Sequence, residues 1–439
     1  MKQGFSSICL SLLFICSSIV YSSATCANQP VDDIATAYVK LVLAMGEHDT
    51  AYVDAYYGPP ELRDTVRSST PSVSNIATQA QELYTQLPIK ENHKKSDDLK
   101  SLRIDYLRTQ LTALAAYANS FNQSSSRNFD AEAKAFYDTK PPKRSLNDFD
   151  NTLEALEALL PGEAPLHERI EIFYKQYEIP KERLPAVFEA AINACRERTL
   201  KYITLPETES FRLEYVTDKP WSGYNWYQGG AHSLIQINTS LPVRIDRAID
   251  LGCHEGYPGH HTYNVLLEAN LVHGRGWVEF SVYPLFSPQS LIAEGSANYG
   301  IELAFPEKEK LEFEKKILYP LAGLDPNTAE HYQTLTSLTR ELSYARNEIA
   351  RQYINGDIKR QHAIELLQHY GPSNRAHAEQ SLDFIDSYGT YLINYNWGKT
   401  LVKHYIERGS DKRNTRWQVF TELLSSPRLP SDLGADYDQ

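Results

Sequence analysis

Apolar residues recur at three- and four-residue spacing through most of the first half of the chain, and this periodicity restricts the fold more than any other feature. Such spacing places apolar side chains along one face of an α-helix. Between residues 31 and 200 the pattern is interrupted at Gly58-Pro59-Pro60, Ser124-Ser125-Ser126, Pro141-Pro142 and Pro161-Gly162. We therefore expect a series of packed helices and a mainly α fold.

Two short segments follow a different pattern. Residues 211–216 and 233–238 alternate between apolar and polar side chains, and a loop rich in Trp, Tyr and Gly joins them at residues 221–230. This alternation predicts two strands, and so a small β-sheet or hairpin next to the histidine-rich helix that follows. Helical periodicity then resumes over residues 244–270, 291–303, 328–355, 358–370, 376–388 and 395–408.

The start of the chain has the layout of a secretory signal peptide. Lys2 precedes an apolar run at residues 8–20 and small residues at 22–24, so we expect removal of residues 1–27 by cleavage after Ala24 or Ala27. A lipoprotein anchor at Cys26 is the alternative, although Thr25 is an unusual residue at such a cleavage site. Either way the sequence predicts export, to the periplasm or the medium.

The rest of the chain is long enough for one large helical fold or several domains. We expect an N-terminal helical region at residues 28–200 that continues into a metal-binding catalytic region at residues 201–439. The net charge of −12 argues against nucleic-acid binding and favours a peptide or small-molecule partner. No later apolar run reaches membrane length. Cys195 and Cys253 could form a disulfide, but a domain of this size does not require one.

The segment His254-Glu255-Gly256-Tyr257-Pro258-Gly259-His260-His261 is the strongest chemical signal. In the common zinc-binding helix, two His four residues apart share one face, and the Glu after the first His acts as general base. Here the next His residues follow six and seven positions after His254, which a regular helix cannot bring to one metal ion. Pro258 and Gly259 can break the helix, and a bulge at this pair would return His260 to the position of a ligand.

This segment, together with Glu294-Gly295-Ser296-Ala297-Asn298-Tyr299, resembles the bacterial family known as domain of unknown function 885. The resemblance covers roughly residues 202–439 and includes the late segment 394–399. It implies zinc peptidase chemistry, with His254, His260 and Glu294 as metal ligands and Glu255 as general base. It also implies that His261 supports the site or binds substrate. Two positions depart from the family pattern. The pattern leads us to expect Trp where this chain has Ser296, and an acidic residue where it has Ile301, although the next residue is Glu302.

Three further assignments rest on weaker signals. Tyr395 could stabilise an oxyanion or could be a core aromatic residue, and Arg375 could hold a substrate carboxylate or belong to a solvated turn. Glu294 could also be only a helix-start charge. The strand at residues 233–238 could align an extended peptide by edge pairing.

The expected function is hydrolysis of amide bonds in short peptides, with one divalent metal ion, most simply Zn²⁺, activating water and Glu255 transferring its proton. Two alternatives remain at this stage. The enzyme could act on non-peptide amides or esters, or the metal could serve a binding protein without catalysis. The presence of Glu255 argues against a non-catalytic binding protein, since structural zinc sites are usually closed by four His or Cys ligands.

Overall fold

The computed structural model of the chain describes residues 29–88, 98–121, 127–219 and 221–434. The predicted signal peptide and Cys26 lie outside these residues. The fold is mainly α with a small β component, as predicted from the sequence. No helix in the described ranges is both long and apolar enough to cross a membrane.

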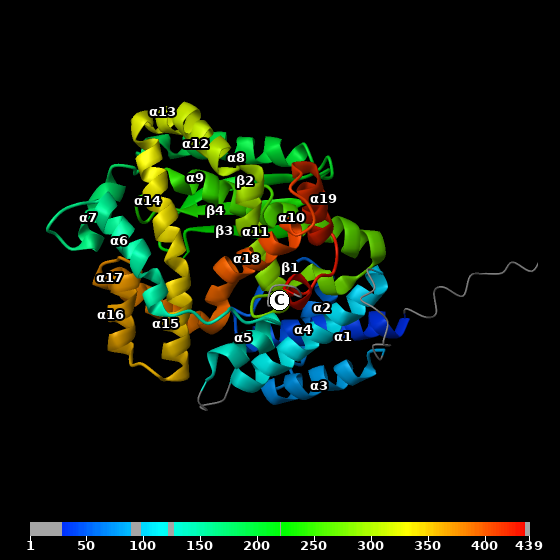
Figure 1. Cartoon of the computed structure of the whole chain (residues 1–439). Coiled ribbons are helices and arrows are strands. Elements are labelled where there is room, and N and C mark those ends of the chain that lie inside the picture. Colours follow the sequence, from blue (N-terminus) through cyan, green and yellow to red (C-terminus); the bar gives the residue numbers. More distant parts are fainter. Residues whose placement is uncertain (1–28, 89–97, 122–126, 220, 435–439) are drawn as a thin grey trace, which may run out of the picture.

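Helices account for most of the first 200 residues. They are α1 (Gln29–His48), α2 (Pro60–Ser68), α3 (Val73–Gln86), α4 (Leu99–Phe121), α5 (Phe129–Tyr137), α6 (Asp150–Leu159), α7 (Leu166–Lys175) and α8 (Leu184–Leu200). Figure 1 shows α1 to α4, coloured blue to cyan, gathered in one part of the molecule, while α8 lies across the top beside the sheet.

The second half contains the remaining helices. They are α9 (Asp246–Leu251), α10 (His260–Leu267), α11 (Pro288–Ala304), α12 (Glu307–Phe313), α13 (Tyr319–Ala322), α14 (Ala329–Glu341), α15 (Ser343–Asn355), α16 (Arg360–Tyr370), α17 (Arg375–Tyr388), α18 (Ile393–Glu407), α19 (Arg413–Leu424) and α20 (Pro430–Leu433). The helix predicted at residues 328–355 is therefore divided into α14 and α15 at Leu342.

The main sheet has three strands rather than the two expected. The strands are β2 (Ser210–Val216), β3 (Gly223–Gly229) and β4 (His232–Asn238), in the spatial order β2-β4-β3. The segment predicted to be a loop thus contains β3, which forms the hairpin with β4, whereas β2 pairs with β4 in parallel. The prediction that residues 233–238 pair with a peptide through a free edge is wrong, because β4 is the central strand.

A second, two-stranded sheet connects distant parts of the chain. Strand β1 (Val53–Tyr56) pairs in antiparallel fashion with β5 (Val282–Pro284), which directly precedes α11. One hydrophobic core includes residues on both sides of residue 200, among them Val39 of α1, Phe188 of α8 and Leu401 of α18. The division at residue 200 itself stays a prediction.

Helices α11 and α18 cross closely because glycine lies at the crossing point. A Cβ atom on Gly295 would be 2.5 Å from the carbonyl carbon of Gly398, a distance that no side chain could tolerate. Ser287 caps the N-terminus of α11 by accepting a hydrogen bond from the backbone N–H of Ser290, and Pro288 occupies its first turn. Because the two helices cross so closely, the part of α11 that carries Glu294 packs against α18 and against the residues that precede α18.

Candidate metal centre

The chain breaks its helix at the Pro-Gly pair. Helix α9 continues into a π-helical segment, Gly252–Gly256, which carries His254 and Glu255. After Tyr257 and Pro258, which are joined by a cis peptide bond, α10 begins at His260. The sequence predicted a bulge at this pair, and the structure instead separates the two histidines onto two helical segments.

Gly259 allows these two segments to meet. Its backbone N–H donates a hydrogen bond to the carbonyl of Cys253 at 3.0 Å. A Cβ atom at this position would lie 1.8 Å from the carbonyl oxygen of His254, so only glycine can pass so close to that backbone. Because the backbone passes so close at Gly259, His260 at the start of α10 lies next to His254.

The three predicted ligands converge. The Nε2 atoms of His254 and His260 are 3.1 Å apart. Glu294, which lies beyond the first turn of α11, approaches His254 Nε2 with Oε2 at 3.3 Å and His260 Nε2 with Oε1 at 3.7 Å. Because Glu294 lies beyond the first turn of α11, it is not the helix-start charge that the sequence left as an alternative. Ligand atoms of Glu255 also lie within 4.8 Å of those of both histidines.

The residues fit a zinc ion on two grounds. Bonds of about 2.0 to 2.1 Å in a tetrahedral site place neighbouring ligand atoms about 3.3 Å apart, close to the shortest His–His and His–Glu distances here. In addition, Oε2 of Glu294 is buried and makes no hydrogen bond of acceptable geometry in the described part of the chain, although His254 Nε2 lies 3.3 Å away. A buried carboxylate oxygen with so little hydrogen bonding is well suited to bind a cation.

The protonation of the two histidines differs. Burial lowers the pKa of His260 to about 4, with the neighbouring His254 adding to this effect, so the ring is neutral and can bind a metal through a lone pair. Burial also opposes protonation of His254, but the carboxylates of Glu294 and Glu255 outweigh it and raise the pKa of that ring.

Glu255 has the environment of a proton-accepting group rather than of a structural ion pair. Its side chain is buried, and no side chain in the described ranges forms a hydrogen bond or ion pair with its carboxyl group. Burial raises the pKa of Glu255 to about 7; the charge of His254 opposes this rise, and the charge of Glu294 adds to it. The adjacent strand β3 approaches it, since a Cβ atom on Gly223 would be 3.1 Å from Oε1 of Glu255.

A third carboxyl group near the site was not predicted. Asp54 of β1 accepts a hydrogen bond from the hydroxyl of Tyr224 on β3. Burial raises the pKa of Asp54 to about 7, and the negative charge of Glu294 contributes. No local pattern marks Asp54, because the pairing of β1 with β5 brings it to the site across more than 200 residues of sequence.

Two tyrosines that precede or begin α18 face the predicted ligand. The hydroxyl of Tyr391, which sequence reasoning missed, donates a hydrogen bond to Oε1 of Glu294 at 2.8 Å. The ring of Tyr395 lies 5.6 Å from that of Tyr391, and 39% of the residue is exposed. Burial of its hydroxyl and the charges of Glu294 and Glu255 raise the pKa of Tyr395 well above its usual range. Tyr395 is thus accessible and close to the carboxylates.

His261 points away from the site. It is 0% exposed, and its two ring nitrogens contact Oγ of Ser233 at 2.8 Å and Oε2 of Glu209 at 3.1 Å. Glu209 also accepts hydrogen bonds from Tyr257, at 2.5 Å, and from Arg196. The predicted contact of His261 with substrate is therefore not supported by its position, and the residue instead joins α10 to the sheet.

Arg375 also lies elsewhere. It is the first residue of α17, which Asn374 caps by accepting a hydrogen bond from the backbone N–H of His377. Its guanidinium group pairs with Glu379 at 2.8 Å and donates to Gln361 at 3.1 Å. The structure does not bring this residue together with His254, His260 and Glu294.

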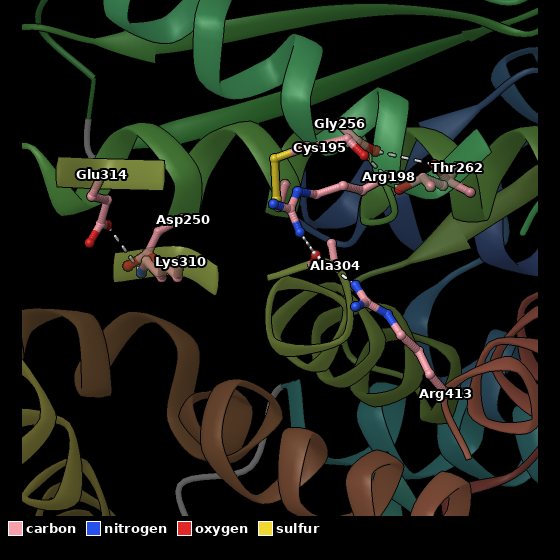
Figure 2. Close-up of a disulfide and its surroundings, with 11 residues drawn as sticks. Cys195, Arg198, Asp250, Gly256, Thr262, Ala304, Lys310, Glu314 and Arg413 are labelled. Atoms are coloured by element: carbon pink, nitrogen blue, oxygen red, sulfur yellow. Dashed lines mark hydrogen bonds and ion pairs between the residues drawn. A yellow bond between two sulfur atoms is a disulfide. The ribbon is translucent and has the colours of Figure 1, made fainter. Parts of the chain in front are cut away.

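A disulfide and a hydrogen bond hold the helical break in place. Cys195 of α8 is bonded to Cys253, the residue before His254 (Figure 2). Across the break, the hydroxyl of Thr262 donates to the carbonyl of Gly256 at 3.4 Å. The disulfide left open by the sequence therefore connects the metal-site segment to a long helix.

Ser296 and Ile301, the two positions where the resemblance led us to expect other residues, pack within the fold. Ile301 is partly buried against the hydrophobic core. Ser296 is buried, and its hydroxyl donates to the carbonyl of Ala293 within α11. Glu302 pairs with Lys399 at 2.5 Å and with Lys403 at 2.9 Å, which links α11 to α18. Glu302 therefore stabilises the helix crossing.

Comparison with known proteins does not assign the chain. No protein-family model matches it, and no curated protein sequence matches it. Among solved structures, it is similar to a "putative lipoprotein" from Colwellia psychrerythraea, with 14% identity over 84% of this chain and 70% of that one and a TM-score of 0.47. A "putative lipoprotein of unknown function" from Shewanella oneidensis shares 13% identity over 85% of this chain and 75% of its own, with a TM-score of 0.45.

Proposed function

We propose that the protein is an exported, zinc-dependent peptidase that hydrolyses amide bonds in short peptides. In this proposal His254, His260 and Glu294 hold the metal ion. The observation that supports it most strongly is the convergence of these three side chains, with Nε2 of His254 3.1 Å from that of His260 and 3.3 Å from the buried Oε2 of Glu294. Membership of the domain of unknown function 885 family is part of the same proposal and rests on the sequence motifs.

Zinc, when bound, supplies Lewis-acid activation of water and of the scissile carbonyl. Glu255 accepts the proton of the attacking water at its carboxylate and delivers it to the leaving amine. No side chain in the described ranges forms an ion pair with the carboxylate of Glu255, so its oxygens are available to accept the proton. Tyr395 donates its hydroxyl proton in a hydrogen bond to the oxygen that becomes negatively charged.

Edge strand β3 is the part of the sheet that suits an extended peptide. It borders the sheet, and its first residue, Gly223, passes beside Glu255. A peptide that pairs with β3 would be held by backbone hydrogen bonds, which recognise an extended chain without selecting its side chains. This feature favours a peptide substrate over a small amide or ester.

The test is a Glu255→Gln variant, which removes the proton-accepting charge with little change in shape. We expect the zinc content to be unchanged and peptide hydrolysis to fall by about 100-fold or more. Zinc content is measured by elemental analysis and turnover with a mixture of short synthetic peptides. Hydrolysis at the wild-type rate would remove Glu255 from the mechanism.

A further inference from the structure

One arginine near Tyr395 has no acidic partner. Arg346 of α15 is half-buried, and no Asp or Glu in the described ranges forms an ion pair with it. Its Nε–H is buried without a hydrogen-bond partner, and one terminal nitrogen makes a marginal contact with the carbonyl of Ser381 at 3.5 Å. Half-buried arginines are generally satisfied by carboxylate or carbonyl groups, and Arg346 lacks a carboxylate partner in the described ranges.

A continuous set of aromatic contacts joins this arginine to the candidate metal centre. The guanidinium carbon of Arg346 lies 5.1 Å from the ring centre of Phe384. The same ring is 6.5 Å from that of Tyr395, which in turn is 5.6 Å from Tyr391. The hydroxyl of Tyr391 contacts Glu294.

The electrostatics agree with this arrangement. The charge of Arg346 acts on the hydroxyl of Tyr395 and opposes the rise in its pKa that Glu294 and Glu255 cause. The hydroxyl of Tyr395 is therefore within electrostatic range of both carboxylates and of Arg346. Arg346 therefore offers a guanidinium group with no acidic partner in the described ranges, near Tyr395, whose hydroxyl interacts with that of Tyr391.

We propose that Arg346 binds the free C-terminal carboxylate of the peptide substrate. The planar guanidinium group can donate two parallel hydrogen bonds to a carboxylate, and no acidic side chain in the described ranges occupies that of Arg346. This inference rests on the proposed peptidase function and makes it specific: the site acts on short peptides near their C-terminus. It also replaces Arg375, whose guanidinium group is already paired with Glu379.

The test measures binding rather than turnover. The zinc-loaded Glu255→Gln protein is titrated by calorimetry with tetra-alanine and with tetra-alanine amide, which differ only in the terminal charge. We expect the free acid to bind about 10- to 100-fold more tightly than the amide, as for a hydrogen bond to a charged group. Arg346→Met should abolish this difference and leave the affinity for the amide unchanged.

Two further variants keep the test decisive. Arg346→Lys retains the charge but loses the planar fork, so it should preserve part of the preference, provided that circular dichroism shows an unchanged fold. Arg67→Met, which changes an exposed arginine paired with Glu47, should leave both affinities unchanged. Equal binding of the two peptides, no binding of either, or a preference that persists in Arg346→Met would each overturn the assignment of Arg346.

The outcome is separable from that of the proposed function. If the wild-type enzyme hydrolyses both peptides at equal rates, the peptidase proposal holds and the role of Arg346 is wrong. If the Glu255→Gln protein shows the preference for the free acid but the wild-type enzyme hydrolyses neither peptide, the binding assignment holds and the peptidase proposal is wrong.

Discussion

Replacing Gly259 by Ala should disable the metal centre without removing any ligand. The added methyl carbon would start 1.8 Å from the carbonyl oxygen of His254 and 2.5 Å from that of Cys253. Both contacts are with backbone, which cannot rotate away as a side chain can. Since Cβ atoms do not approach closer than 3.0 Å, the two chain segments must separate by at least about 1.2 Å.

This displacement can be converted into an expected loss of affinity. Metal–ligand distances vary by only about 0.2 Å in well-formed sites, so a movement several times larger takes His260 out of reach of an ion held by His254. Removing groups that merely orient a ligand already costs about 10- to 100-fold in affinity. We expect Gly259→Ala to bind zinc at least about 100-fold more weakly, which corresponds to about 2.7 kcal/mol of lost stabilisation by the ion.

The assay is a zinc titration in competition with a chromogenic chelator, together with thermal unfolding in zinc and in a chelator. Gly256→Ala is the matched control, because a Cβ atom there would lie 3.9 Å from its nearest neighbour and should be accommodated. Equal zinc affinity in Gly259→Ala and Gly256→Ala, with the same zinc-dependent rise in unfolding temperature, would refute the predicted backbone clash.

Three further predictions concern the surroundings of the site. Tyr391→Phe removes the hydrogen bond to Glu294 and should weaken zinc binding by about 10- to 100-fold in the same titration. Burial alone would raise the pKa of Glu209, but its hydrogen bonds lower it from 4.5 to about 2. Ionised Glu209 should therefore stabilise the fold above pH 4.5, and this contribution should disappear as the pH falls towards 2. The urea midpoint of Glu209→Gln should accordingly fall less than that of the wild type between pH 4.5 and pH 2. Replacing Cys195 and Cys253 by Ala should cost about 2 to 5 kcal/mol in urea unfolding; an unchanged midpoint would exclude a stabilising role.

The sequence predicted the features that depend on local periodicity. Helix α11, for example, was expected at residues 291–303 and is found at Pro288–Ala304, because its apolar spacing is a local signal. The predicted ligands His254, His260 and Glu294 also meet. Pro258 and Gly259 indicated that the helix is irregular, although not that the chain breaks completely between the two histidines.

The features that were missed depend on contacts between distant residues. The order of strands β2, β4 and β3 places the expected edge strand in the centre, and no property of residues 233–238 alone decides this. Tyr391 is one of 29 tyrosines, and only the crossing of α11 and α18 distinguishes it from those that pack in the core. Arg346 resembles any helical arginine until its neighbours are known to lack a carboxylate.

Strand β3 is an instructive intermediate case. Its exposed Trp226 alternates with the buried residues Asn225 and Tyr227, so the period of a strand was present in the segment predicted to be a loop. The nearby glycines Gly223, Gly229 and Gly230 favoured a loop. The loop prediction followed the turn-forming glycines, which in fact mark the ends of the strand, rather than the weak alternation between them.

The measurement that tests the account most directly is elemental analysis of the purified mature protein beside two histidine variants. We predict about one zinc ion per chain in the wild type and its loss in His260→Ala. His273→Ala, which changes an exposed histidine paired with Glu268, should retain the ion. A wild-type protein that takes up no metal even when zinc is supplied, or a His260→Ala variant that keeps it, would contradict the metal centre and the hydrolase mechanism built on it.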